Sequence, residues 1–207
     1  ATHADDLAAL LDALGIGHAH LLGISYGGEV AQAFALRHGT RVASLVLADT
    51  VSEAGPELRL VIEGWRRVAA SGDPEAFFAV TVPWNFSPAF IAANPALIED
   101  ARRRYRDLDL GAVVRLCDAF LGVDFTRELS ALRVPACVLV GERDLLKGPA
   151  YAQRLAAAMP GAELHVLPDA GHAACWEQPE AFNAIVLDFL DRVPPPTPAV
   201  AGEWMLP

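Results

Sequence analysis

The chain has 207 residues, of which 53% are hydrophobic and 20% charged, and its formal net charge at pH 7 is -10. A chain of this length and hydrophobic content can bury a substantial core, which argues against intrinsic disorder. The acidic balance disfavours nucleic acid and anionic membrane surfaces as partners. No apolar run approaches the roughly 18 residues that a membrane-spanning helix needs. We therefore expect a globular protein with neither kind of partner.

Residues 1–50 alternate between helical and strand patterns. Residues 4–14 have the periodicity of an amphipathic helix, which Gly15 ends. The apolar pair Leu21–Leu22 indicates a short strand, and the run 42–48 indicates another. We assign residues 1–50 to the protein core.

A sharp turn follows the first of these strands, with the sequence Gly23-Ile24-Ser25-Tyr26-Gly27-Gly28. An Ala-rich helical pattern begins directly after it and reaches about His38, with Glu29 in its first turn, where a carboxylate suits the helix dipole. A serine at such a strand-to-helix turn is strained and projects its hydroxyl at the helix N-terminus. GxSxG alone is a weak signal. Its context here favours a nucleophile elbow with Ser25 as the nucleophile.

Residues 51–130 change character, because the strand patterns stop. Helical patterns cover 56–70, 74–80, 88–93, 95–106 and 109–121, and Pro83-Trp84-Asn85-Phe86-Ser87-Pro88 interrupts them. An all-helical insertion between two core strands is typical of a cap over an active site. We predict that residues 51–130 form a helical cap above the carboxyl ends of the strands.

Aromatic residues gather in this insertion. Trp65, Phe77 and Phe78 are expected to bury the core of the cap itself. Trp84 and Phe86 lie in the helix-breaking segment, where packing and a pocket role are equally open. We carry Trp84 and Phe86 forward as substrate-binding candidates, which suggests an apolar acyl or ring-bearing substrate.

The core resumes at residues 131–192 with two further strand patterns. The apolar run 135–141 ends just before Asp144, and the run 162–167 ends just before the loop that carries His172. The carboxyl ends of parallel strands meet at one edge of a sheet, so both side chains are expected there. Helices are predicted near 149–159 and 179–191, and residues 193–207 are predicted as an extended, proline-rich tail.

Three sequences in this order carry a family resemblance: Gly23-x-Ser25-x-Gly27-Gly28, Gly141-Glu142-Arg143-Asp144 and Gly171-His172. The chain resembles the α/β-hydrolase superfamily, specifically the single-chain serine hydrolases with a helical cap, from about residue 2 to about residue 192. The resemblance implies a mostly parallel sheet with flanking helices. It also implies that Ser25 is the nucleophile, His172 the base and Asp144 its orienting acid. The backbone N–H of Tyr26 would supply half of the oxyanion hole.

Two other carboxylates compete for the role of the acid. Asp49 follows the strand at 42–48, where some members of the family place their acid. Asp169 is close to His172 in sequence, but Pro-Asp-Ala-Gly is typical of a turn. Asp144 could itself be a solvated loop carboxylate. We prefer Asp144, because its strand immediately precedes that of His172.

The family has roughly four strands before the elbow strand, for which this sequence has no room before Ser25. We therefore expect an N-terminally truncated α/β-hydrolase fold. Loss of the second oxyanion donor costs roughly 3 kcal/mol of transition-state stabilisation. Residues 1–207 alone are expected to hydrolyse esters poorly and to self-associate through the exposed edge of the sheet.

The chemistry expected from these residues is hydrolysis of a small-molecule carboxylic ester, lactone or thioester through an acyl-enzyme. A cofactor-free perhydrolase or acyltransferase would use the same residues, and a non-catalytic ligand-binding fragment of the fold is an alternative from another class. A haloalkane dehalogenase is disfavoured, because it needs Asp where Ser25 stands. No metal or other cofactor is expected. The scattered cysteines, Cys117, Cys137 and Cys175, favour reduced thiols and a cytoplasmic location.

Overall fold

The predicted strands pair into one parallel sheet. In the computed structural model, which describes residues 2–194, the sheet has four strands in the order β1-β2-β3-β4. Their bounds are β1 (Ala19–Ile24), β2 (Val42–Ala48), β3 (Ala136–Gly141) and β4 (Glu163–Leu167). Of the predicted tail, all but residues 193 and 194 lies outside the described residues.

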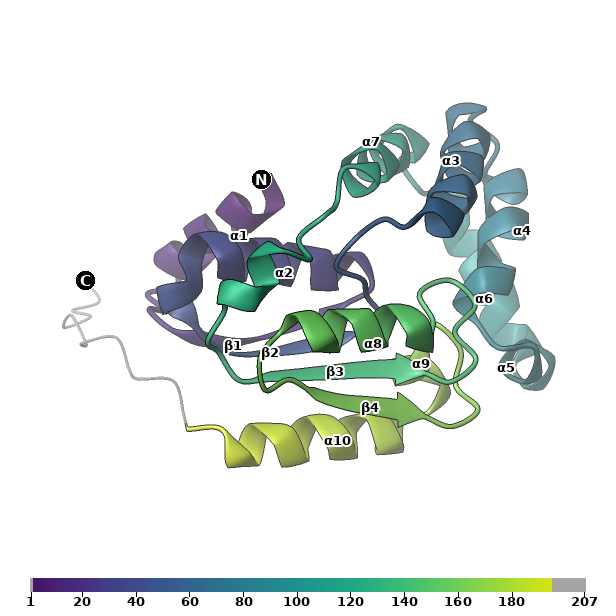
Figure 1. Cartoon of the computed structure of the whole chain (residues 1–207). Coiled ribbons are helices and arrows are strands. Elements are labelled where there is room, and N and C mark those ends of the chain that lie inside the picture. The colour runs from purple at the N-terminus through teal and green to yellow at the C-terminus, as the bar shows by residue number, and fades with distance from the viewer. Residues whose placement is uncertain (1, 195–207) are drawn as a thin grey trace, which may run out of the picture.

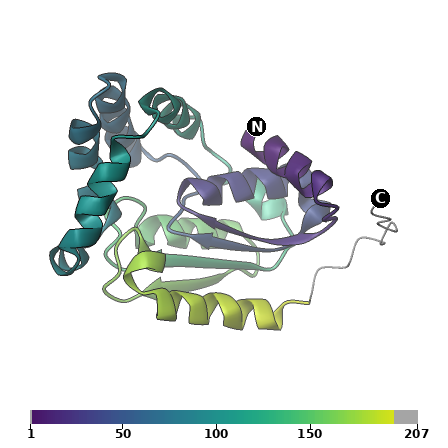
Figure 2. The same cartoon turned by 180° about the vertical axis from the view of Figure 1, so that it is seen from behind.

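Helices cover both faces of this sheet (Figures 1 and 2). One face carries α2 (Tyr26–His38), with α1 (Thr2–Ala13) packed on it, and α8 (Pro149–Ala158); the other carries α10 (Pro179–Arg192). Along β2, Leu45 and Leu47 join the cluster of the first face, whereas Val46 and Ala48 join that of the second. Each fully buried leucine stabilises the fold by about 2 kcal/mol. This layered arrangement confirms the predicted α/β class.

The sheet has β1 at one edge, where it pairs with β2. Leu22 of this strand is 47% exposed. Self-association through this edge stays a prediction. No helix within residues 2–194 combines the length and the apolar character that crossing a membrane requires.

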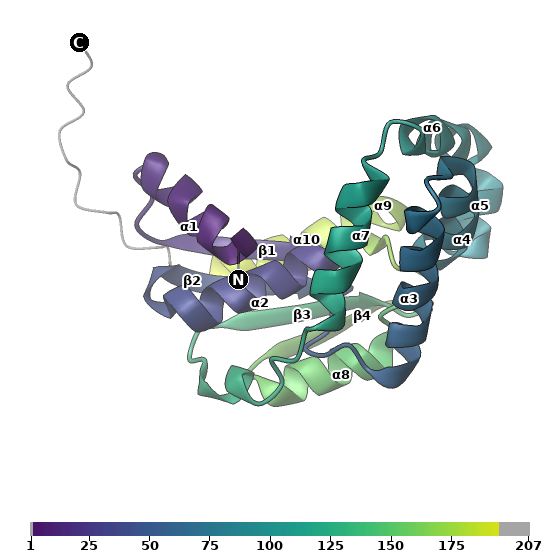
Figure 3. The ribbon, with the colours of Figure 1, turned by 90° about the horizontal axis from the view of Figure 1, so that it is seen from above.

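Residues 51–130 contain helices and no strand. The helices are α3 (Pro56–Ala70), α4 (Pro74–Asn85), α5 (Pro88–Ala93), α6 (Pro95–Tyr105) and α7 (Leu110–Leu121). Figures 1 and 3 show them beyond the carboxyl ends of the strands. The segments that lead into and out of these helices lie side by side. The Ala54 N–H donates to the Val123 carbonyl (3.0 Å), and the Phe125 N–H donates to the Ser52 carbonyl (2.8 Å).

The largest difference from a predicted helix boundary is at α4. The helix expected at 74–80 continues to Asn85, through Pro83, so Trp84 lies on a helix. Proline removes the hydrogen bond that its own N–H would make, but in the last turn the remaining bonds suffice, and Phe86 N–H still donates to the Val82 carbonyl (3.3 Å). The break therefore begins at Phe86. A short helix after His172, α9 (Ala174–Glu177), was not predicted.

Candidate active site

The serine turn joins β1 directly to α2. Ser25 has φ +52° and ψ −122°, and α2 begins at the next residue. A non-glycine residue held in such a conformation stores of order 1–3 kcal/mol of strain. The Ser25 N–H donates to the Ala48 carbonyl (2.9 Å), which anchors the turn to β2. Gly23 has no tolerance for a side chain, because a Cβ there would lie 2.3 Å from the Gly27 carbonyl oxygen.

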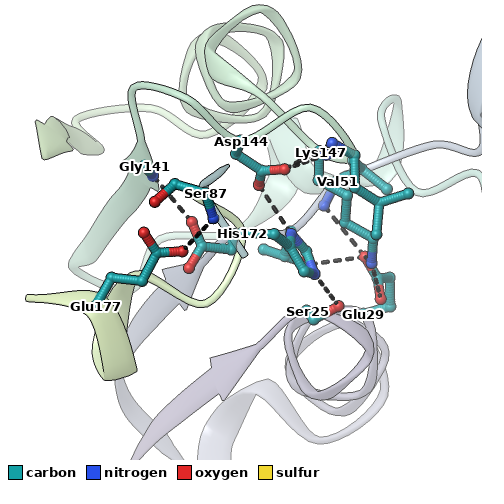
Figure 4. Close-up of polar contacts among 12 residues, drawn as sticks. Ser25, Glu29, Val51, Ser87, Gly141, Asp144, Lys147, His172 and Glu177 are labelled. Carbon is teal, nitrogen blue, oxygen red and sulfur yellow. Dashed lines mark hydrogen bonds and ion pairs between the residues drawn. The ribbon is translucent and has the colours of Figure 1, made fainter. Parts of the chain in front are cut away.

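The structure brings the serine, the histidine and the acid together (Figure 4). Ser25 Oγ lies 2.9 Å from His172 Nε2, and His172 Nδ1 lies 2.8 Å from Asp144 Oδ2. The side chain of Asp144 is 0% exposed and that of His172 is 7% exposed. Both distances are within hydrogen-bond range. Three loops that are far apart in sequence thus form one continuous hydrogen-bonded chain.

The loop after β3 holds the Asp144 carboxylate in a fixed orientation. Its Oδ1 accepts hydrogen bonds from the backbone N–H groups of Leu146 and Lys147, both at 2.8 Å. The other oxygen, Oδ2, is left to accept from His172. Hydrogen bonds to an ionised acceptor are the stronger kind. The acid therefore points at the imidazole without depending on solvent.

A buried ion pair ties the same loop to the elbow helix. Lys147 Nζ lies 2.8 and 3.1 Å from the two carboxylate oxygens of Glu29, and the side chains are 3% and 2% exposed. The Thr50 hydroxyl and the Val51 N–H also donate to Glu29, at 2.7 and 3.1 Å. Lys147 Nζ lies 4.6 Å from the centre of the Phe120 ring. From sequence, Glu29 was assigned only to the helix dipole, and Lys147 was missed.

The rival carboxylate, Asp49, makes no hydrogen bond to His172. Its Oδ1 accepts from the Gly141 N–H (3.0 Å), and its buried Oδ2 has no partner among the described residues. Burial, reinforced by the neighbouring Asp144 and Glu177 carboxylates, raises the pKa of Asp49 to about 8. Asp169 is exposed and pairs with Arg143. Of the three carboxylates considered, the structure places Asp144 against the histidine.

Two pockets share Ser25 in their linings. The larger, about 970 Å³, is lined by Ser25, His172 and Phe86 together with residues of α4, α6 and α9. The smaller, about 140 Å³, is lined by Ser25 and Tyr26 together with residues of α3 and α7 and of the Asp144 loop. We call them the large pocket and the small pocket.

The two aromatic candidates for substrate binding line different pockets. Phe86 lines the large pocket, whereas Trp84 lies in a third pocket of about 240 Å³ beside Asp144. Phe77 and Phe78 are buried, and Trp65 lines the small pocket. Within residues 2–194 no three His, Cys, Asp or Glu side chains cluster closely enough to hold a metal ion.

Comparisons with known proteins give the context of this geometry. A family profile described as alpha/beta hydrolase fold matches residues 1–179. The chain is 33% identical over 196 residues to the 2-hydroxy-6-oxononadienedioate/2-hydroxy-6-oxononatrienedioate hydrolase of Burkholderia vietnamiensis. The alignment covers 90% of this chain and 67% of that protein.

Two solved structures are similar over the same extent. The enol-lactonase from Burkholderia xenovorans has a TM-score of 0.84 at 29% identity, covering 91% of this chain and 72% of that one. A thermophilic esterase from Thermogutta terrifontis, with malate bound, has a TM-score of 0.82 at 33% identity, covering 91% and 71%. These relatives are hydrolases by name. The profile match, which spans most of the residues, establishes that the chain belongs to the α/β-hydrolase family of enzymes.

Proposed function

We propose that the protein is a serine hydrolase that cleaves a carboxylic ester, lactone or thioester through an acyl-enzyme. The observation that supports this most directly is the hydrogen-bonded chain from Ser25 Oγ through the imidazole of His172 to Asp144. A strained serine at the start of a helix, in contact with a base that a third group orients, is the arrangement that nucleophilic catalysis requires.

In the first half of the reaction, Ser25 Oγ attacks the substrate carbonyl while His172 Nε2 takes its proton. Asp144 Oδ2 accepts the hydrogen bond from Nδ1–H, which fixes the tautomer and stabilises the imidazolium that forms. The negative charge develops on the carbonyl oxygen near the N-terminus of α2. The Tyr26 N–H, the first of this helix, donates to that oxygen, and the helix dipole adds to the stabilisation.

Acylation is complete when His172 gives this proton to the leaving oxygen or sulfur and the bond from that atom to the carbonyl carbon breaks. In the second half, the same imidazole takes a proton from water while the water oxygen bonds to the acyl carbon. The bond from that carbon to Ser25 Oγ then breaks, His172 returns the proton to Oγ, and the carboxylic acid leaves. The helices α3–α7 act as a cap, which shields the ester from bulk water and contacts its apolar parts through residues such as Phe86.

Labelling by a fluorophosphonate tests the proposal. The wild-type protein is expected to be labelled on Ser25, Ser25→Ala to be unlabelled, and His172→Ala to be labelled much more slowly. Ser130→Ala removes an exposed serine and is the matched control, expected to label like the wild type. Circular dichroism confirms that each variant is folded. A folded Ser25→Ala that still labels and turns over a p-nitrophenyl ester would refute Ser25 as the nucleophile, and an unlabelled wild type would favour the ligand-binding alternative.

A further inference from the structure

The two pockets beside Ser25 differ about sevenfold in volume, at 970 and 140 Å³. Ser25 lines both of them, so an ester carbonyl at its Oγ would lie between the two spaces. An ester has two substituents, one on its carbonyl carbon and one on its leaving oxygen. With one substituent in each pocket, the small pocket limits the size of the group that it holds.

The wall of the small pocket is apolar. Besides Ser25, Tyr26 and Lys147, its lining comprises Ile62, Trp65, Leu116, Cys117, Phe120 and Leu146. The one cation in this lining is neutralised, because the Lys147 ammonium is buried against the Glu29 carboxylate at 2.8 Å. A carboxylate on the substrate would find no free partner there, and its desolvation would be costly. The small pocket suits an uncharged alkyl group.

The position of His172 decides which substituent goes where. His172 lines the large pocket but not the small one. The leaving oxygen must receive its proton from the imidazole, so it has to lie on the side of His172. The alcohol part then extends into the large pocket. The acyl chain is directed to the opposite side of Ser25, where the small pocket lies.

We propose that the small pocket is an acyl subsite for a short, uncharged chain, and that the preferred substrates are short-acyl esters of larger, apolar alcohols. This inference rests on the proposed function. A dry cavity of about 150 Å³ in another protein holds one benzene molecule. By that measure the small pocket holds an acyl chain of up to about six carbons.

Two series of esters test the assignment on the purified protein. In the first, p-nitrophenyl acetate, butyrate, hexanoate and decanoate vary only the acyl chain; kcat/KM should fall at least about tenfold between butyrate and decanoate, since one misfitting methylene already costs about that factor. In the second, acetates of ethanol, hexanol and naphthol vary only the alcohol. There kcat/KM should hold or rise with size.

Three matched leucine variants assign each preference to its pocket. Leu116 of the small pocket, Leu108 of the large pocket and Leu187 on α10 are 38%, 42% and 59% exposed. Leu116→Ala should raise the decanoate-to-butyrate ratio of kcat/KM at least about tenfold. Leu108→Ala should change the alcohol series instead. Leu187→Ala lies outside both pockets and should change neither ratio.

The outcomes separate this inference from the proposed function. If no ester shows turnover that depends on Ser25, the proposed function fails and the subsite with it. If Ser25-dependent turnover is fastest with decanoate, or if Leu116→Ala shifts the alcohol series, the hydrolase survives and the acyl subsite is refuted.

Discussion

Two ion pairs, one between α2 and the loop after β3 and one between α3 and α7, differ in how far they are exposed to water. The side chains of Glu29 on α2 and Lys147 after β3 are 2% and 3% exposed, so this pair is buried. In the helices, Arg66 and Asp118 pair while 40% and 50% exposed, and the residues of α6 behave similarly. The first pair is buried, and its Lys147 lines the same pocket as Ser25, whereas the second faces water.

This difference separates two tasks of the molecule. A buried charge that loses its partner costs about 3–5 kcal/mol, so the loops around Ser25 tolerate little change. Exposed ion pairs contribute little, so the helices above can change their charges at little cost. We infer that the loops at the carboxyl ends of the strands fix the reaction geometry and that the helices α3–α7 set the substrate range. The predictions below test this separation, from the largest effect to the smallest.

The largest effect is expected from Asp144→Asn. The amide would favour the wrong imidazole tautomer and could not stabilise the imidazolium, and such a change lowers kcat about 10⁴-fold in enzymes of this mechanism. Asp49→Asn is the matched control and should lower kcat far less, because Asp49 does not contact His172. Ester turnover by the folded variants measures both. The reverse ranking would move the acid to Asp49.

Lys147→Met should destabilise the fold by about 3–5 kcal/mol, because it leaves the Glu29 carboxylate buried without its partner. The double variant Glu29→Gln with Lys147→Met removes both charges and should be more stable than Lys147→Met alone. Urea unfolding gives the free energy of unfolding for each. A loss below about 1 kcal/mol for Lys147→Met would show that this pair behaves like an exposed one.

The sequence predicts the parts of the site that depend on local pattern. The glycine-flanked serine between a strand and a helix, and the polar residues after the last two strands, are readable because each lies within one short segment. Their order along the chain then indicates that Ser25, Asp144 and His172 meet. In the structure, the side chains of Ser25, His172 and Asp144 lie within hydrogen-bond distance in that sequence of contacts.

What the sequence does not reveal depends on contacts between distant segments. Glu29 and Lys147 are 118 residues apart, and neither lies in a motif that suggests the other. Trp84 was assigned to a helix-breaking segment because it follows Pro83, but proline is tolerated in the last turn of α4, so Trp84 lies on the helix. The two pockets arise only when α3–α7 fold back over the sheet.

An effect that depends on pH is expected from Asp49→Asn. The folded pKa of Asp49 is raised to about 8 from an ordinary value of 3.8, so the folded state keeps a proton that the unfolded state loses. The contribution of the Asp49 carboxyl to stability is complete below about pH 4 and is lost as the pH rises to about 8, by roughly 1.4 kcal/mol per pH unit at most.

Asparagine resembles the protonated acid and does not titrate. Asp49→Asn should therefore be more stable than the wild type near pH 8, with the advantage shrinking towards pH 4. Thermal unfolding at several pH values measures this difference. A variant whose advantage is the same at every pH would show that Asp49 is ionised in the folded protein.

The smallest effect is expected from Arg66→Ala, which removes the ion pair between α3 and α7. Arg66 Nε lies 2.5 Å from Asp118 Oδ1, a distance as short as any that hold the active site together. Distance alone would therefore predict a large loss. Both side chains are hydrated in either state, so removing the pair should leave Tm nearly unchanged, and adding salt to the wild type should have a similarly small effect. Thermal unfolding beside Lys147→Met makes the comparison direct. If Arg66→Ala lost as much stability as Lys147→Met, burial would not explain the difference between the two ion pairs. The helices α3–α7 could then not change their charges at little cost.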